Sequence, residues 1–356
     1  MQNRRSKTVP PARAATGATG PAGPSRPHDV YVLSEDESRL LDEIAAEVAT
    51  AYDNVEDPRF IADARLFAQR LPFGLRRWIE QVRLSADLGS FRIRGHRLRD
   101  ADLPPTPPEF EREPSRPALP PEVCLVLFGV LLGDVFGWET QQAGRLVHDI
   151  VPSEQEQKSQ TSASSAVELG WHTEDAFHPY RADYLGLACV RNPDRVPTTL
   201  AELRSLELSE RTQSVLSQPR FYQRPDTSHS PTGSDDVGAW ADPPLARVLS
   251  GMAGSRSLCV DADFTVAADD EDTEAESALE ELKREIESKL GDLVLEPGDY
   301  LFLDNQRCVH GRRPFRARFD GTDRWLKRVS VTRDLRRMAE AGVTATKRTA
   351  RAVLAS

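Results

Sequence analysis

A histidine and an acidic residue two positions apart in an extended segment could bind a metal ion together. The segment Gly170-Trp171-His172-Thr173-Glu174-Asp175 contains such a pair. Alternate side chains of a strand face the same way, so His172 and Glu174 can reach one point. An imidazole and a carboxylate at that point would supply two ligands of a 2-His-1-carboxylate facial triad, the ligand set of non-haem Fe(II) oxygenases.

The third ligand of such a triad must be a distant histidine that the fold brings back. The candidate is His310, in Asn305-Gln306-Arg307-Cys308-Val309-His310-Gly311-Arg312, which follows an expected strand over Tyr300–Asp304. A His-x-Glu pair alone is weak evidence, because such pairs occur by chance and their histidines then make ordinary hydrogen bonds. A distal histidine followed by a suitably spaced arginine strengthens the metal hypothesis.

Two arginines follow the candidate third ligand at fixed spacing. Arg324 lies fourteen residues after His310, and Arg328 lies four residues further on. A guanidinium group can bind a carboxylate through two parallel hydrogen bonds, which would fix the far end of a dicarboxylic cosubstrate. A lone arginine is usually a surface ion-pair partner, but this spacing favours the binding role.

The elements that would position these residues are helical first and mainly β afterwards. Ser34 and Glu37 form a capping-box pattern before a helix with apolar residues at helical spacing. Further helical segments are expected over Pro58–Leu84 and Glu122–Gly137. Short β-branched or aromatic segments separated by turn signals predict strands over Tyr184–Arg191, Ser257–Val260, Asp292–Leu295, Tyr300–Asp304 and Lys327–Thr332.

The composition predicts one ordered domain with poorly ordered ends. Residues 1–28 are rich in Arg, Pro, Ala, Gly and Ser and are expected to be a disordered tail. A single domain is predicted over 29–340, with a mainly helical part over 29–137 and a β core over 138–335. The core would carry a lid at about 217–242 and an acidic helix at about 268–290, and residues 341–356 are expected to be flexible.

Charge, hydropathy and cysteine content exclude several classes of protein. With 56 acidic and 46 basic residues the net charge is −10, which disfavours nucleic acid as a partner. The longest apolar run, Val123–Gly137, contains Asp134 and is too short to cross a membrane. The N-terminus has no apolar segment of the signal-peptide type, and the four cysteines form no Cys-x-x-Cys pair. A cytoplasmic protein with free thiols is therefore predicted.

Several linked motifs resemble the clavaminate synthase-like Fe(II)/2-oxoglutarate-dependent oxygenases. The resemblance is closest to the free amino acid β-hydroxylases of the viomycin-pathway arginine type, and it covers roughly Phe136 to Thr332. The motifs that carry it are Gly137-Trp138-Glu139-Thr140-Gln141-Gln142, Ser159-Gln160-Thr161, Val167-Glu168-Leu169 before His172-Thr173-Glu174, the stretch from Gly298-Asp299 to His310, and Asp320-Gly321-Thr322-Asp323-Arg324-Trp325-Leu326.

This resemblance implies a mainly β fold with flanking helices, built on a double-stranded β-helix (jelly-roll) core. It implies Fe(II) on His172, Glu174 and His310, with 2-oxoglutarate as cosubstrate and O2 as oxidant. Matching positions place Arg324 on the distal carboxylate of 2-oxoglutarate, with Thr199, or else Thr198, as its threonine partner. They also place Arg328, Gln141 and Glu174 around the head group of an amino acid substrate.

The side chain of that substrate depends on Asp261 and Asp263. They stand where arginine hydroxylases have two aspartates against the guanidinium group, and two carboxylates at i and i+2 would favour a cationic side chain. The alternative is a pair of surface turn residues. The resemblance implies hydroxylation of free L-arginine at C3 in specialised metabolism such as antibiotic biosynthesis. Segment Ser217–Asp242 would be the lid.

Other functions remain open from the sequence. An oxygenase of the same family could act on lysine, citrulline or a cyclic guanidine, at C3 or C4, or catalyse desaturation or cyclisation. A metal-binding β-barrel isomerase would not need Arg324, and a non-catalytic binding protein would usually have lost a metal ligand. His148, His178 and His229 lack ligand spacing and are predicted to be non-catalytic. The expected partner is a small amino acid, with neither nucleic acid nor membrane, and a homodimer is left open.

Overall fold

The structure is a computed structural model, and it describes residues 29–85, 88–110, 118–225, 229, 243–252, 254–344 and 346–352. The predicted tail over 1–28 and most of the predicted lid lie outside the described residues. The helices are α1 (Glu35–Ala51), α2 (Pro58–Ala68), α3 (Phe73–Arg83), α4 (Pro120–Leu132), α5 (Glu210–Leu216) and α6 (Thr273–Lys289). None of the helices in the described part of the chain is long and apolar enough to cross a membrane.

The strands form two principal sheets and two short ribbons. They are β1 (Val30–Val32), β2 (Ser90–Arg94), β3 (Asp134–Trp138), β4 (Val147–Ile150), β5 (Leu169–His172), β6 (Tyr184–Arg191), β7 (Thr198–Glu202), β8 (Phe221–Gln223), β9 (Leu249–Ser250), β10 (Ser257–Leu258), β11 (Thr265–Ala267), β12 (Gly291–Leu293), β13 (Tyr300–Asp304), β14 (Cys308–Arg312), β15 (Trp325–Thr332) and β16 (Thr349–Ala350). The large sheet has the order β1-β2-β13-β6-β15-β3-β16 with β4 also paired to β15, and the small sheet has the order β12-β7-β14-β5.

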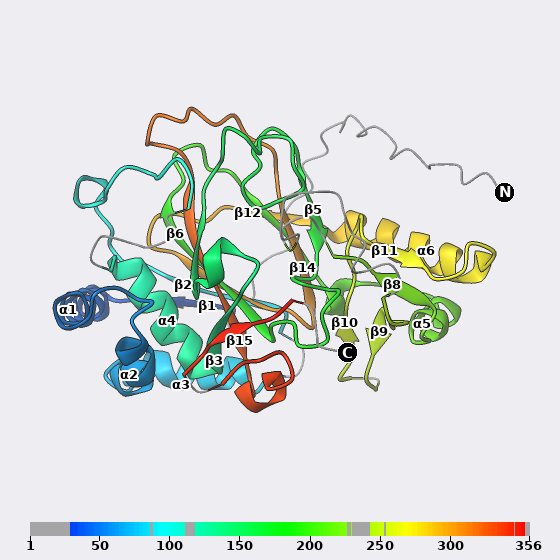
Figure 1. Ribbon diagram of the computed structural model, residues 1–356, viewed down its shortest axis with the longest axis horizontal. Helices are drawn as coiled ribbons and strands as arrows, with labels where there is room; N and C mark the ends of the chain where they lie inside the picture. The colour runs from blue at the N-terminus through cyan, green and yellow to red at the C-terminus, as the bar shows by residue number, and fades with distance from the viewer. Residues whose placement is uncertain are drawn as a thin grey trace.

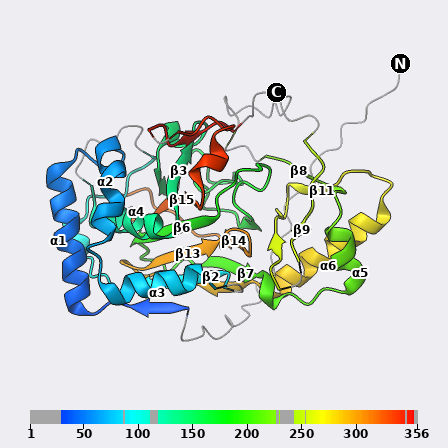
Figure 2. The same ribbon diagram turned by 90° about the horizontal axis from the view of Figure 1, so that it is seen from below.

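The two principal sheets face each other across an apolar layer. Leu187, Leu301 and Leu326 of the large sheet belong to the same buried cluster as Cys308 of the small sheet, and Leu200 packs against it. Two facing sheets are the jelly-roll core that the family resemblance implies. The opposite face of the large sheet is covered by helices, with α4 lying against β15 and β6 and with α1, α2 and α3 around α4 (Figures 1 and 2).

Helix α4 is apolar on all sides because it lies between the sheet and the other helices. Every residue from Pro121 to Val130 is buried. The expected helix over Glu122–Gly137 is nevertheless too long, because α4 ends at Leu132 and Asp134–Trp138 forms strand β3. Gly133 allows this reversal, since a Cβ atom there would collide with the carbonyl oxygen of Thr332. The expected helix over Pro58–Leu84 is two helices, α2 and α3, and Pro72 is at the N-cap position of α3.

The C-terminal segment differs from the flexible end that its composition predicts. Residues Thr349 and Ala350 form β16, which pairs in parallel with Gly137 and Trp138 of β3. Val343 and Ala350 are buried in a cluster with Phe136 and Trp138. The large sheet therefore includes β2 and β16, which lie before and after the expected core range of 138–335.

A smaller lobe made of α5, α6 and β8 to β11 lies at the opposite end of the molecule from α1 and α2 (Figure 2). The acidic helix α6 buries Leu279, Leu282 and Ile286 in one cluster with Val215 and Leu216. This lobe is attached to the small sheet directly after β5, where the backbone N–H of Thr173 donates to the carbonyl oxygen of Val260 at 2.8 Å. Residues from both parts can therefore line one cavity.

Strand β15 is held from behind by buried charges. Lys327 is fully buried, forms an ion pair with Glu122 at 2.6 Å and makes a second ion pair with Asp149. The indole N–H of Trp325 donates to Asp149 at 2.7 Å. Because side chains alternate along a strand, this anchoring directs Arg328 to the opposite face, where it lines the cavity.

Candidate active site

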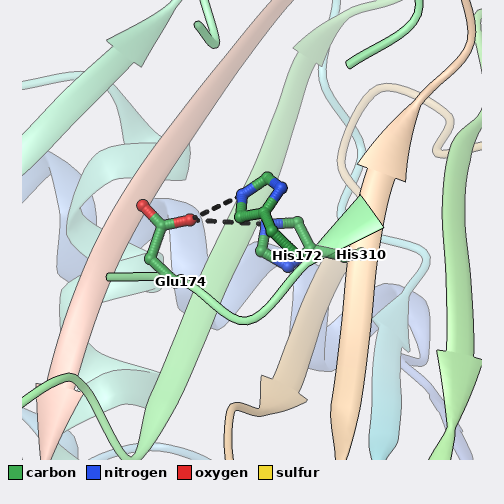
Figure 3. A group of neighbouring side chains, drawn as sticks. All are labelled: His172, Glu174 and His310. Atoms are coloured by element: carbon green, nitrogen blue, oxygen red, sulfur yellow. Dashed lines mark ion pairs between the residues drawn. The ribbon is translucent and has the colours of Figure 1, made fainter. Parts of the chain in front are cut away.

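His172, Glu174 and His310 meet at the open end of the small sheet. His172 is the last residue of β5 and lies directly opposite His310 of β14, and Glu174 follows two residues later. Their ligand atoms all lie within 4.8 Å of one another, and the three side chains point toward a common centre (Figure 3). The Glu174 Oε2 atom is 3.4 Å from His172 Nε2 and 3.5 Å from His310 Nε2.

The donor set and its orientation fit a divalent iron ion. His172 Nδ1 lies 2.9 Å from the carbonyl oxygen of Gly170, which orients the ring so that Nε2 faces Glu174. Burial alone would raise the pKa of Glu174, but Arg328 and the two histidines hold that pKa well below its usual range. Two imidazole nitrogens and one ionised carboxylate converging beside an open cavity are the ligands of a non-haem Fe(II) site.

A cavity of about 820 Å³ opens from these three side chains. It is lined by residues from both sheets and from the smaller lobe. Those with polar side chains or a direct bearing on the chemistry are Gln141, His148, His172, Glu174, Thr198, His229, Asp261, Asp263, His310, Arg312, Arg324 and Arg328. The cavity therefore contains every predicted site residue except Thr199.

One end of the cavity is built around Arg328. Its guanidinium group forms an ion pair with Glu174 Oε1, and its Nη2 atom donates to Gln141 Oε1 at 2.8 Å. The same nitrogen lies 2.8 Å from His148 Nδ1. Burial and then the charge of Arg328 lower the pKa of His148 to about 3, so at neutral pH its unprotonated Nδ1 accepts this hydrogen bond. His148 thus supports Arg328 rather than contributing a metal ligand.

Another end of the cavity contains Arg324. Burial lowers the pKa of its guanidinium group to about 10. The Nη2 atom of Arg324 lies 3.3 Å from Thr198 Oγ1. Of the two threonines that the resemblance leaves open, Thr198 is thus the one beside Arg324, and Thr199 faces the other way because consecutive side chains alternate along β7. Thr199 lies opposite Gly311 in the sheet, and its buried hydroxyl has no hydrogen-bond partner among the described residues.

Arg312 is a second cation at this end of the cavity that the sequence reasoning missed. Its Nη2 atom donates to Ser164 Oγ at 2.8 Å, whereas its Nε and Nη1 atoms, like Nε of Arg324, have no partner among the described residues. Burial and then the charge of Arg324 lower the pKa of Arg312 to about 9. Unpartnered buried donors on two neighbouring arginines fit a carboxylate group. The sequence could have indicated Arg312 through its position two residues after His310, because side chains two apart on one strand face the same way.

Thr198→Val and Thr199→Val should have opposite consequences. We expect Thr198→Val to raise the KM for 2-oxoglutarate about tenfold, because one hydrogen bond beside Arg324 is lost. Thr199→Val should leave that KM unchanged and not lower the midpoint of thermal unfolding, because it removes a buried hydroxyl without a described partner. Steady-state kinetics and thermal denaturation of both variants test this, and an effect on KM from Thr199→Val alone would restore the original prediction.

Asp261 and Asp263 line the cavity from the smaller lobe. Asp261 is half-buried, and its Oδ1 atom accepts hydrogen bonds from the backbone N–H groups of Asp263 at 2.8 Å and Phe264 at 2.9 Å. Burial raises the pKa of Asp261. Asp263 is exposed and lies close to Gly170, where a Cβ atom would be 3.2 Å from its Oδ2. The pair forms a turn, as the alternative interpretation expects, but this turn lies at the cavity.

Glu174 is also fixed through its backbone by Asn305, a residue for which the sequence predicts no role of its own. The side chain of Asn305 accepts from the N–H of Glu174 at 2.9 Å and donates to its carbonyl oxygen at 3.0 Å. It also donates to the carbonyl oxygen of Ala182 at 3.0 Å. A single amide thus connects the metal-binding turn to the start of β6.

Comparison with known proteins agrees with this site. Residues 126–330 match the family model "Taurine catabolism dioxygenase TauD, TfdA family". The chain therefore belongs to the TauD/TfdA family and is an Fe(II)- and 2-oxoglutarate-dependent oxygenase, which uses dioxygen as oxidant.

Two curated relatives and one solved structure are similar over most of the chain. Enduracididine beta-hydroxylase of Streptomyces hygroscopicus is 38% identical over 335 residues, which are 89% of this chain and 98% of the relative. L-ornithine/L-arginine 3-hydroxylase of Catenulispora acidiphila is 36% identical over 311 residues, 82% of this chain and 90% of that protein. The crystal structure of the non-heme iron oxygenase OrfP in complex with Fe, succinate and (3S)-hydroxy-L-Arg has a TM-score of 0.85 and 41% identity, covering 90% of this chain and 99% of OrfP.

Proposed function

We propose that this protein hydroxylates a free amino acid with a cationic side chain, most simply L-arginine at C3. The observation that carries this proposal is that Asp261 and Asp263 line the same cavity as the iron-ligand triad and Arg328. A ligand with a carboxylate at one end and a guanidinium group at the other would find opposite charge at both ends. Two proteins similar to this chain are named as hydroxylases of enduracididine or of ornithine and arginine, and the similar OrfP structure contains (3S)-hydroxy-L-Arg.

Each residue has a defined part in this proposal. When bound, iron with 2-oxoglutarate and dioxygen supplies the oxidising power that converts a C–H bond to C–OH, with the cosubstrate released as succinate and carbon dioxide. His172, Glu174 and His310 hold the metal, and Arg324, with Thr198 and Arg312, binds the distal carboxylate of 2-oxoglutarate. Arg328 and Gln141 bind the head of the amino acid beside the metal, which favours attack at the neighbouring β carbon.

Citrulline provides a matched test of the aspartate pair, because it has the shape of arginine without the charge. Fe(II)-reconstituted enzyme, opened to air with 2-oxoglutarate, should convert L-arginine to a product heavier by one oxygen with an equal amount of succinate. We expect kcat/KM for citrulline to be lower by about tenfold or more, since hydrogen bonds to charged groups stabilise more than neutral ones. Lysine, ornithine and a cyclic guanidine complete the panel.

Asp261→Asn should reduce kcat/KM for L-arginine at least about tenfold and change that for citrulline much less, because the lost interaction requires a cation. Product mass and succinate, measured together, report both rates and coupling. Equal losses for the two substrates would remove Asp261 from side-chain recognition. If another amino acid were the preferred substrate, the iron chemistry would stand and the substrate assignment would fail.

The remaining features of the proposal concern organisation. We propose one oxygenase domain that begins near residue 29 and includes β16, acting on its substrate in the cytoplasm without nucleic acid or membrane. Homodimer formation stays a prediction that light scattering of the purified protein would test.

A further inference from the structure

His229 lies buried beside the turn that carries Glu174, although its position in the sequence gave no indication of a role. Between residues 226 and 242 it is the single residue that the structure describes. Its ring packs edge-on against Phe177 with centroids 4.7 Å apart and against Trp138 with centroids 5.7 Å apart. The ring is therefore held within the cavity wall.

The two ring nitrogens of His229 contact residues from two separate segments. Nδ1 lies 2.8 Å from Thr140 Oγ1, and Nε2 lies 3.0 Å from Gln141 Nε2 and 2.8 Å from Asp175 Oδ1. Residues 140 and 141 follow β3, whereas Asp175 follows Glu174 directly. His229 thus joins the segment that bears Gln141 to the turn that bears an iron ligand.

The orientation of the Gln141 amide is set by Arg328. Its Oε1 atom accepts a hydrogen bond from Arg328 Nη2 at 2.8 Å, so its amide nitrogen faces His229. If the amide were reversed, two donors would meet at Arg328, because a guanidinium group has no acceptor. The Nε2–H of His229 donates to Asp175 and Nδ1 is left to accept from the hydroxyl of Thr140, so His229 acts on Gln141 through the residue directly before it.

The backbone on either side of this contact adopts conformations that need support. Asp175 has a φ of 51°, and Gln142 and Ala143, directly after Gln141, have φ values of 43° and 58°. Non-glycine residues in this left-handed region persist when surrounding contacts hold them. The carboxylate of Asp175 is held by His229 on Oδ1 and by the indole N–H of Trp138, 2.6 Å from Oδ2.

We infer that His229 is a positioning residue for the amino acid end of the cavity, an inference that rests on the proposed function. Through Thr140 it holds the segment that bears Gln141, and through Asp175 it holds the turn after Glu174. Its contacts with Thr140, Gln141 and Asp175 lie at the amino acid end of the cavity. Loss of His229 should therefore misplace the amino acid while leaving cosubstrate binding intact.

The test compares His229→Ala, His229→Gln and Thr140→Val with the unmodified enzyme and with His178→Asn. His178 is a matched control, because it is buried against the same Trp138 ring at 4.6 Å and is not among the described residues that line the cavity. Asparagine can replace the acceptor that His178 Nδ1 offers to the N–H of Tyr180. Thr140→Val removes one contact of the His229 ring without changing the histidine.

For His229→Ala we expect the KM for L-arginine to rise about tenfold and the ratio of succinate to hydroxylated product to increase, since a misplaced substrate is oxidised less efficiently. The dissociation constant for 2-oxoglutarate, followed anaerobically by the visible charge-transfer band of its Fe(II) complex, should stay within about twofold. Thr140→Val should show a smaller change of the same kind, His229→Gln should recover part of the coupling, and His178→Asn should match the unmodified enzyme.

Unchanged KM and coupling in folded His229→Ala, or equal changes in His178→Asn, would overturn the inference. A rise in the dissociation constant for 2-oxoglutarate equal to the rise in KM for arginine would do the same, because the effect would then not be confined to the amino acid end. Failure of the unmodified enzyme to oxidise any cationic amino acid would instead overturn the proposed function. If His229→Ala did not fold, Thr140→Val alone would decide.

Discussion

The His172→Ala and His310→Ala variants should lose amino acid-dependent succinate formation by more than about a hundredfold, the upper range for loss of a residue that only supports a metal ligand. Each substitution leaves two of the three donor atoms that lie within 4.8 Å of one another. The remaining carboxylate of Glu174 is already paired with Arg328, so it would compensate poorly for a missing imidazole.

Iron content after anaerobic reconstitution and desalting gives a measurement that is independent of turnover. We expect less than one tenth of the iron retained by the unmodified protein, consistent with a loss of affinity above about tenfold. His178→Asn, a substitution of another buried histidine outside the triad, should retain iron. Full iron binding and activity in either ligand variant would refute the assignment.

Replacement of Arg324 should have the second-largest effect, and it should be confined to the cosubstrate. Arg324→Met should raise the dissociation constant for 2-oxoglutarate about a hundredfold or more, because removing one partner of a buried charge pair costs about 2–5 kcal/mol. Arg324 is fully buried beside Thr198 and its Nε atom has no partner among the described residues, so a carboxylate bound there would depend on it.

Arg324→Lys separates charge from geometry. Lysine keeps the positive charge but not the planar fork of donors, so we expect an affinity for 2-oxoglutarate between those of Arg324→Met and the unmodified enzyme. Iron content and the dissociation constant for L-arginine, measured in saturating 2-oxoglutarate, should stay near their normal values. A loss of arginine affinity without loss of 2-oxoglutarate affinity would mean that Arg324 and Arg328 have exchanged roles.

The sequence was sufficient to predict the residues whose spacing is itself a structural statement. His172 and Glu174 could be paired because side chains two apart in an extended segment face the same way. The same rule could not choose between Thr198 and Thr199, because it distinguishes odd from even positions only once one residue of the strand has been placed. The structure provides that reference through Arg324, and the choice falls on Thr198.

Residues that act through contacts between distant segments could not be predicted from their spacing in the sequence. Asn305 reaches Glu174 across 131 positions of sequence, and His229 reaches Asp175 across 54. The end of α4 was also missed, because the apolar run through Val123–Gly137 suits a buried strand as well as a buried helix. Only the close approach of Gly133 to Thr332 shows where the chain reverses.

In the proposed function, two parts of the molecule share the recognition of the substrates: one face of β15 and the smaller lobe. In the proposed function Arg324 and Arg328 bind the carboxylates of the cosubstrate and of the amino acid. They lie directly before and within β15, which Lys327 and Trp325 hold from behind. Asp261 and Asp263 belong to a small lobe whose hydrophobic cluster, built around α6, extends to Trp171 and Val309 of the small sheet but includes no residue of β15. Substitutions in that lobe could therefore alter which side chain is accepted during evolution, or in the laboratory, while the strand that binds the invariant carboxylates stays unchanged.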